Sequence, residues 1–360
     1  MRRVIFAAIV FLILGWRCAE RHRVYFQYGE EVKPIGRVGD GNINFLWVRS
    51  LLAAPGKDFE VFDGSIVVSD LRNRLYLINE MGKIVKSIRL KGSVNGKVLI
   101  NGEYAYFTTS GDRFRLIKLS LRNTGDKIEK KVYSVFEPVL VDSLLLVVSM
   151  DGKVYCMSKE NLGVVWIRKL KNRVYFAPFS VDGMVYIIDF RGRLFSVEIP
   201  SGKLRKATDL PTMPETVLPV DDTLIVFGGR DGKLLLYNVT ENRIRWMVKL
   251  HGRIVSKPLL KNGMLIVGTM ADSIYMVDFK KGKVLDRIYI GEPVSTDMVG
   301  VGTVAIFGSL SRKLICFDII KKQVVWKCKL KGRVISNPLL FGDFLVVGCE
   351  YKYVYLFELR

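Results

Sequence analysis

The side chains that could carry out chemistry are few and far apart along the chain. His22 and His251 are the only histidines, and the five cysteines include no Cys-x-x-Cys and no adjacent pair. A zinc site takes four His or Cys ligands, and a redox pair takes two neighbouring thiols. Four cysteines lie in apolar, strand-like runs: Cys156, Cys316, Cys328 and Cys349. We expect these four to be small buried hydrophobic side chains, with no metal and no cofactor bound.

Carboxylates could provide acid or base catalysis at three places. Asp221 and Asp222 are adjacent, and their position between two apolar runs indicates a solvated turn. Asp297 and Glu137 fall in the first strand of their repeat units, where they could face a central channel and shape a small-ligand site, or be ordinary polar residues at strand ends. There is no Gly-x-Ser-x-Gly motif and no glycine-rich phosphate-binding loop. The sequence therefore predicts a protein that is not an enzyme.

The first residues have the pattern of an export signal. Met1-Arg2-Arg3 is followed by thirteen apolar residues, 4–16, which is short for a stable transmembrane helix. We interpret 1–18 as an export signal or an uncleaved N-terminal membrane anchor, and 19–44 as a polar tether. Cys18 is a candidate lipidation site, although Arg17 stands where lipoprotein signals carry a small residue. The protein is expected to be exported to the periplasm and tethered to a membrane, the outer membrane if Cys18 is lipidated.

A repeat determines how the remaining side chains are positioned. The segments VVWIRKL (164–170), IRWMVKL (244–250) and VVWKCKL (324–330) lie 80 residues apart, and apolar positions at Leu210 and Ile290 halve that interval to 40. From residue 253 the runs RIVSKPLL, MLIVGTM, IYMVDF and VLDRIYI are separated by KNG, ADS and KKGK. Such short β-branched and aromatic runs predict strands, and four strands (A to D) in about 40 residues make one propeller blade.

The count of units predicts a closed ring. The last unit, 331–360, has runs for strands A to C only, and FLWVRSL at 45–51 resembles a D strand without its own A to C. Pairing the two ends removes exposed sheet edges. We predict an all-β fold, with residues 45–360 forming a single eight-bladed β-propeller of four-stranded antiparallel blades whose last blade is closed by the N-terminal strand. If the longer unit at 91–133 does not form a full sheet, the ring would have seven blades.

The units resemble the blades of the quinoprotein-like, or PQQ-like, propellers. The matching pieces are Asp151-Gly152-Lys153-Val154-Tyr155, Asp231-Gly232-Lys233-Leu234, Tyr275-Met276-Val277-Asp278 with Gly282-Lys283, and the outer-strand Val325-Trp326 and Arg245-Trp246. No Gly-His and no Trp-Asp pair occurs, which excludes a WD-repeat protein. Within this group the chain is most similar to the BamB-like outer-membrane assembly factors, which share the export signal, the short tether and eight blades of this length.

This resemblance implies a non-catalytic scaffold that binds other proteins of the cell envelope, among them the subunit that inserts β-barrels into the outer membrane. Two alternatives stay open. One is an envelope propeller with an unrelated partner, and the other is a quinone-dependent dehydrogenase. The dehydrogenases need a catalytic Asp, calcium ligands and long inserts over the channel, whereas the connections here are short. We expect the propeller to be monomeric.

Charge is the other strong feature, since the formal net charge is +21. In an up-and-down blade the D–A loops and B–C turns lie on one face, and the A–B and C–D turns lie on the other. The face of the D–A loops and B–C turns is predicted to carry about ten net positive charges. Its D–A loops contribute Lys91, Lys171, Arg173, Arg253, Lys331 and Arg333, and its B–C turns Arg72, Arg74, Arg113, Arg191, Arg193, Arg230, Arg312 and Lys313. The A–B turns of the other face lean acidic, with Asp63, Glu103, Asp142, Asp182, Asp221, Asp222 and Asp343.

Such a face suits an acidic protein surface or an anionic membrane surface. The candidate partner-binding residues are Arg173, Arg193, Arg253, Arg312 and Arg333. Nucleic acid is not expected as a partner, because stacking aromatic residues are not interleaved with the basic ones and an exported protein rarely meets nucleic acid. A Lys/Arg-rich surface without a binding role is the alternative.

Overall fold

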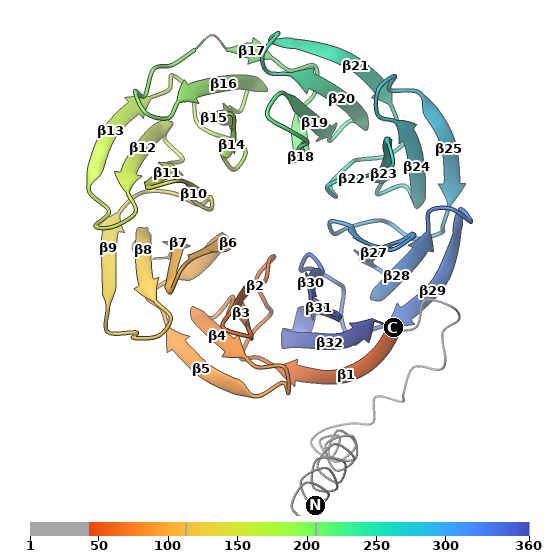
Figure 1. Ribbon diagram of the computed structural model, residues 1–360, viewed down its shortest axis with the longest axis horizontal. Helices are drawn as coiled ribbons and strands as arrows, with labels where there is room; N and C mark the ends of the chain where they lie inside the picture. The colour runs from red at the N-terminus through yellow and green to blue at the C-terminus, as the bar shows by residue number, and fades with distance from the viewer. Residues whose placement is uncertain (1–42, 112–113, 206, 360) are drawn as a thin grey trace, which may run out of the picture.

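The chain folds into a ring of radially arranged sheets (Figure 1). The computed structural model describes residues 43–111, 114–205 and 207–359. Within these residues, eight four-stranded antiparallel sheets form, which confirms the predicted eight-bladed propeller. The longer unit at 91–133 makes a complete sheet, β6 to β9, so the seven-bladed alternative is wrong.

The strands of blades 1 to 4 are short and follow the chain in order. Blade 1 contains β2 (Glu60–Phe62), β3 (Ser65–Asp70), β4 (Arg74–Ile78) and β5 (Ile84–Arg89), and blade 2 contains β6 (Ser93–Asn101), β7 (Tyr104–Ser110), β8 (Arg115–Ser120) and β9 (Lys127–Lys131). Blade 3 contains β10 (Val139–Val141), β11 (Leu144–Val148), β12 (Lys153–Ser158) and β13 (Val164–Lys169), and blade 4 contains β14 (Phe179–Val181), β15 (Met184–Ile188), β16 (Arg193–Glu198) and β17 (Thr208–Asp209).

Blades 5 to 8 repeat this order. Blade 5 contains β18 (Pro214–Pro219), β19 (Leu224–Gly229), β20 (Lys233–Asn238) and β21 (Arg243–Lys249), and blade 6 contains β22 (Leu259–Lys261), β23 (Met264–Gly268), β24 (Ser273–Asp278) and β25 (Val284–Tyr289). Blade 7 contains β26 (Val299–Val301), β27 (Val304–Ser309), β28 (Lys313–Asp318) and β29 (Gln323–Lys329). Blade 8 contains β30 (Leu339–Phe341), β31 (Phe344–Cys349) and β32 (Tyr353–Leu359), with a 3-10 turn at Glu350–Lys352.

The two ends of the chain close the ring together, as predicted. Strand β1 (Ile43–Ser50) is the fourth strand of blade 8 and pairs antiparallel with β32 along its length, from Ile43 opposite Leu359 to Ser50 opposite Tyr353. In Figure 1 the red β1 lies directly outside the blue β32. Strand β1 begins at Ile43, slightly before the predicted position 45. The predicted signal, the rest of the predicted tether and Cys18 lie outside the described residues.

The innermost strands are shorter than predicted. The run RIVSKPLL at 253–260 was expected to form one strand, but β22 begins only at Leu259, and β30 likewise begins after Pro338. Proline has no N–H to donate, so it does not extend a strand into the sheet. The residues before it form the loop that crosses from the outer rim to the channel.

The hydrophobic core lies between neighbouring blades. Ile274 and Met276 of blade 6, for example, pack with Phe307 and Ile315 of blade 7, and all four are buried. Full burial of such a side chain stabilises the fold by roughly 1.5–3 kcal/mol. Because each blade covers the apolar face of the next, no blade has a core of its own.

Tryptophans on outer strands fasten one blade to the next. Three indole N–H groups donate to carbonyl oxygens in the C–D turn of the following blade: Trp47 to Glu80 at 2.7 Å, Trp166 to Ile199 at 2.8 Å and Trp246 to Phe279 at 2.8 Å. Each ring also packs against a turn glycine with positive φ, as Trp246 does against Gly282. A Cβ at Gly282 would lie 2.5 Å from the indole, so only glycine fits there.

In blades 1 and 6 a charged residue takes the place of tryptophan. Lys86, four residues before Leu90 in the way that Trp246 precedes Leu250, donates to the carbonyl oxygen of Leu121 at 2.7 Å. Asp286 at the same position of blade 6 pairs with Lys322 at 2.9 Å.

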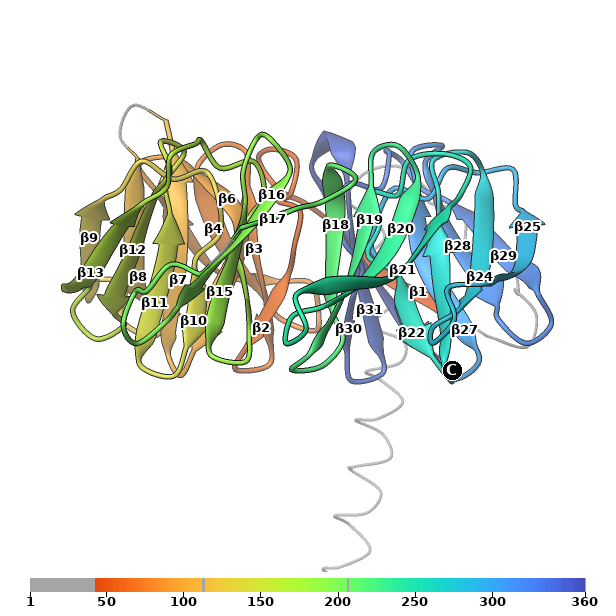
Figure 2. The same ribbon diagram turned by 90° about the horizontal axis from the view of Figure 1, so that it is seen from above.

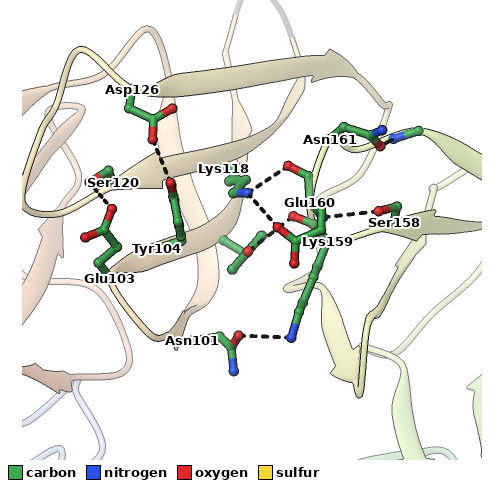
Figure 3. Close-up of polar contacts among 12 residues, drawn as sticks. Asn101, Glu103, Tyr104, Lys118, Ser120, Asp126, Ser158, Lys159, Glu160 and Asn161 are labelled. Atoms are coloured by element: carbon green, nitrogen blue, oxygen red, sulfur yellow. Dashed lines mark hydrogen bonds and ion pairs between the residues drawn. The ribbon is translucent and has the colours of Figure 1, made fainter.

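A buried lysine joins blades 2 and 3 (Figure 3). Lys118 of β8 is 6% exposed, and it donates to the carbonyl oxygen of Glu160 at 2.7 Å and pairs with the Glu160 carboxylate at 3.6 Å. Its ammonium lies 4.1 Å from the ring centre of Tyr104, whose hydroxyl donates to Asp126 at 2.7 Å. The ammonium is therefore surrounded by oxygens and an aromatic face, which makes its burial tolerable.

Gly282→Ala tests the fit between indole and turn, with Gly263→Ala as the matched control. Both glycines have positive φ, but no atom lies within 4 Å of a Cβ at Gly263. Gly263→Ala should cost about 1–2 kcal/mol of unfolding free energy from backbone strain alone. Gly282→Ala should cost roughly 1–3 kcal/mol more because Trp246 must move. Urea unfolding followed by tryptophan fluorescence measures both, and equal losses would contradict the proposed packing role of the indole.

Candidate functional site

The turns of the propeller form two opposite faces, seen edge-on in Figure 2. Single bridges link D–A loops to the ends of B strands: Pro55 to Asp70, Val174 to Asp189, Val294 to Ser309 and Val334 to Cys349. D–A loops and B–C turns therefore share one face, which we call the DA–BC face. The A–B and C–D turns form the AB–CD face.

All five candidate partner-binding arginines lie on the DA–BC face. Arg173, Arg253 and Arg333 lie in D–A loops, and Arg193 and Arg312 lie at B–C turns. Arg113, counted with them in the sequence, lies outside the described residues. The expected position of these side chains is thus found in the fold, while their binding role stays a prediction.

Carboxylates on the same face neutralise three of the five arginines. Glu215 accepts from Arg253 at 2.8 Å and also from Arg230 at 2.7 Å. Glu350 accepts from Arg333 at 2.7 Å. These two glutamates were not singled out in the sequence, where only their distance of 38 and 17 residues from the arginines is visible. The third arginine, Arg193, pairs at 3.0 Å with the buried Asp189, which lies only four residues away in the sequence.

Other cations of this face remain without an ion pair. Among the described residues, no carboxylate forms a salt bridge with Arg72, Lys91, Lys171, Arg173, Arg191 or Arg312. Five of these six lie in blades 1 to 4 or in the loops that lead into them: Arg72, Lys91, Lys171, Arg173 and Arg191. The free positive charge is therefore unevenly distributed around the face.

Apolar side chains are exposed on the B–C turns of the same face. They are Leu71, Phe190, Leu310 and Tyr351. Two hollows include them: one of about 270 Å³ lined by Asn172, Arg173, Phe190 and Arg191, and one of about 550 Å³ lined by Ala54, Leu310, Arg312, Arg333, Glu350 and Tyr351. A face that combines apolar tips with cations has the composition of a binding surface.

Asp297 and Glu137 do not lie in the innermost strands, contrary to expectation. Asp297 precedes β26 and Glu137 precedes β10. Asp297 accepts from the backbone N–H of Lys257 in the preceding blade at 2.7 Å. Burial raises the pKa of Glu137, and the backbone N–H of Lys97 in its preceding blade partly offsets this rise. Both carboxylates therefore join blades rather than shape a ligand site.

Similar contacts connect blade 7 to blade 8 and blade 8 to blade 1. Asp297 donates its own N–H to Asn337 Oδ1 at 2.9 Å, and the Asn337 N–H donates to the carbonyl oxygen of Lys57 at 2.6 Å. Asn337 Nδ2 also donates to Asp58 Oδ1 at 2.7 Å, which connects blade 8 to blade 1. A calcium-dependent quinone site needs carboxylate oxygens that are free to bind the ion. Asp297 and Asp58 already accept hydrogen bonds from neighbouring blades, so they do not suit that role.

Asp221 and Asp222 lie in an A–B turn, where a solvated turn was expected. Asp221 accepts from the backbone N–H groups of Thr223 at 2.7 Å and Leu224 at 2.8 Å. Burial alone would raise the pKa of Asp221, but these hydrogen bonds hold it below its usual value. The carboxylate stabilises its own turn.

The cysteines are buried, as predicted. Cys156, Cys316, Cys328 and Cys349 are free thiols in strands, and burial raises the pKa of Cys316 to about 12. A thiol of such high pKa is a poor nucleophile at neutral pH. Over the described ranges, no cluster of three or more His, Cys, Asp or Glu side chains could hold a metal ion. In the same ranges, no helix is long and apolar enough to cross a bilayer.

Comparison with known proteins gives one consistent result. A PQQ-repeat family model described as outer membrane protein assembly factor BamB matches residues 122–205 and 191–289. The curated protein of that name from Moranella endobia is 20% identical over 246 residues, 61% of this chain and 63% of its own length. The one from Nitrosomonas eutropha is 23% identical over 171 residues, 45% of this chain and 40% of its own length. The matched region thus spans less than two thirds of either relative.

Solved structures share the fold. The crystal structure of BamB from Moraxella catarrhalis superposes with a TM-score of 0.72 at 15% identity, covering 88% of this chain and 99% of the other. The computationally designed Ika8 protein superposes with a TM-score of 0.71 at 10% identity, covering 86% and 97%. At these identities, superposition shows the fold alone.

Asn337→Asp tests the connection at the channel. The new carboxylate cannot donate to Asp58 and repels it, which should lower the unfolding free energy by about 2–3 kcal/mol at pH 7. Protonation of either carboxylate removes the repulsion, so the deficit in unfolding free energy relative to wild type should shrink as the pH falls towards 4. Urea unfolding at both pH values measures this.

Asn262→Asp is the matched control for that substitution. Asn262 lies in an exposed A–B turn with positive φ, a conformation that Asp also tolerates. Its unfolding free energy should stay within about 0.5 kcal/mol of wild type at both pH values. A deficit at Asn337→Asp that is independent of pH would contradict the contact with Asp58.

Proposed function

We propose that this chain, a BamB-like propeller of PQQ-type repeats, acts as a non-catalytic scaffold in the assembly of outer-membrane β-barrel proteins. The observation that carries the proposal is the agreement of the family model and the curated relatives on BamB, while the superposed structures support the fold alone. The partner we propose is the subunit that inserts β-barrels into the outer membrane, and the DA–BC face is the docking surface. The protein is exported to the periplasm and held at a membrane by its N-terminal segment.

The architecture supports a binding role for a rigid surface. Loops on a rigid framework commonly carry function, and here the D–A loops are bridged to the ends of B strands at four places. The cations without ion pairs on this face favour an acidic partner, because complementary charge speeds encounter and selects orientation. Those already paired to Glu215, Glu350 or Asp189 contribute less to such attraction.

The position of β1 supports an orientation of the scaffold. As an outer D strand, β1 starts at the AB–CD face and ends at Ser50, beside the D–A loop of blade 1. The described chain therefore enters the propeller at the AB–CD face. A partner docked on the DA–BC face would lie on the face opposite to this start of β1.

The test is in-cell crosslinking of the full-length protein, followed by purification and identification of the bound proteins. We expect the barrel-inserting subunit to co-purify. Charge reversal of the cations without ion pairs, Arg72→Glu, Arg173→Glu, Arg191→Glu and Arg312→Glu together, should reduce its recovery by roughly tenfold or more. Arg253 and Arg333 are avoided because their reversal would also break internal ion pairs.

The matched control reverses four exposed lysines on the AB–CD face: Lys83→Glu, Lys203→Glu, Lys280→Glu and Lys281→Glu. Recovery should then stay near wild type. If another envelope protein is recovered in place of the barrel-inserting subunit, the fold assignment stands and the assembly function is rejected. If both sets of reversals reduce recovery equally, the DA–BC face is not the docking surface.

A further inference from the structure

One hollow on the DA–BC face combines cations and an aromatic ring with no carboxylate in its lining. Asn172 and Arg173 of the D–A loop, with Phe190 and Arg191 of the B–C turn, enclose about 270 Å³ over blade 4. The larger hollow near blade 8 differs, because its lining includes Glu350, which is already paired with Arg333. Of the two, the blade 4 hollow therefore has the more strongly positive lining.

A buried carboxylate below this hollow fixes its shape. Asp189 accepts from Asn172 Nδ2 at 2.6 Å and from the backbone N–H groups of Arg191 at 2.8 Å and Arg193 at 3.0 Å. Burial alone would raise the pKa of Asp189, but these hydrogen bonds hold it below its usual value. The Asp189 carboxylate thus joins the D–A loop to the B–C turn. A site shaped in advance loses less entropy on binding.

The aromatic ring of the hollow is held at the surface. Phe190 is 57% exposed, and its ring meets Tyr175 edge-on, with centroids 5.3 Å apart and planes at 78°. The Tyr175 hydroxyl in turn lies 3.5 Å from Arg230 Nη2. An exposed aromatic side chain supported in this way can act as a rigid anchor for an apolar group of a partner.

Size and charge together define the occupant. Small-molecule pockets usually measure about 300–1,000 Å³, so this hollow suits one apolar side chain of a protein segment. Arg173 and Arg191 flank that position, and Lys171 lies at the start of the same loop. We propose that the blade 4 hollow binds an acidic protein segment of the partner, which inserts an apolar side chain against Phe190 and places carboxylates beside Arg173 and Arg191. This inference rests on the proposed scaffold function.

Binding of a short fluorescent peptide of alternating Asp/Glu and Leu/Phe residues to the full-length protein tests the proposal by anisotropy. The acidic peptide should bind, a peptide with Lys in place of Asp and Glu should not, and added salt should weaken binding. Phe190→Ser and the pair Arg173→Glu with Arg191→Glu should each weaken binding by roughly fivefold or more. Because these side chains are exposed, both variants should fold.

Two control variants isolate the hollow from general effects. Ile320→Ser removes an apolar side chain that is 61% exposed on the AB–CD face, and Arg312→Glu alters the other hollow. Both should bind the acidic peptide as tightly as wild type does. If Arg312→Glu weakens binding as much as the blade 4 variants do, the charge of the whole face is responsible and the proposal is overturned.

Phosphatidylglycerol vesicles provide a further control. If the protein binds these vesicles, loses that binding in Phe190→Ser and does not bind the acidic peptide, the hollow binds a membrane surface and the proposal is overturned.

Photo-crosslinking in cells separates this proposal from the scaffold function. A photo-reactive phenylalanine at Phe190 should crosslink to an acidic, apolar segment of the barrel-inserting subunit, and one at Leu310 should do so far less. Crosslinks at Leu310 alone would overturn the blade 4 site and leave the scaffold function intact. Failure to recover the subunit in the pull-down would reject the scaffold function, and the peptide measurement would still decide whether the hollow binds acidic segments.

Discussion

The contact between the outer strand of one blade and the C–D turn of the next is the interaction on which the ring depends. It is made by an indole against a glycine at Trp47, Trp166 and Trp246, and by charged groups at Lys86 and Asp286. Each solution joins a D strand to a turn of the next blade, so the angle between blades is kept although the side chains differ. An indole–glycine contact and a charged contact therefore serve the same structural role between different pairs of blades.

Hydrogen bonds at the channel complete this constraint from the inside. Asp297 and Asn337 accept the backbone N–H of the blade before, while the indoles act at the outer rim. Blade 6 is thus joined to blade 7, and blade 8 to blade 1, at both the channel and the outer rim. With the framework fixed, the D–A loops and B–C turns can carry charge and apolar groups at defined positions, and it is the pairing of these charges that distinguishes one sector of the DA–BC face from another.

The fold could be predicted well from the sequence because the same pattern of strands and turns recurs in each repeat unit. Apolar runs, turn residues and the unmatched strand near residue 45 together led to eight blades and to their closure. The innermost strands were overestimated, because Pro258 and Pro338 interrupt runs that are otherwise strand-like. A run of apolar residues shows burial but does not show which residues pair.

The candidate site was less accessible from sequence, for a physical reason. The sequence shows charges, whereas binding depends on which of them remain without ion pairs. Glu215 reaches Arg253 across 38 positions, and Asp189 fixes both sides of the blade 4 hollow from beneath. Such pairing depends on loops that meet only after folding.

The pairing of β1 with β32 has a consequence for how the protein reaches its native state. Strand β1 can find its neighbour only after β32 has been synthesised, so the ring cannot close before β32 has emerged. Until then β32, whose side chains are largely buried in the finished fold, has an open edge that could pair with another chain. A late, long-range closing step of this kind makes folding slow, and it gives chaperones a defined interval in which to act.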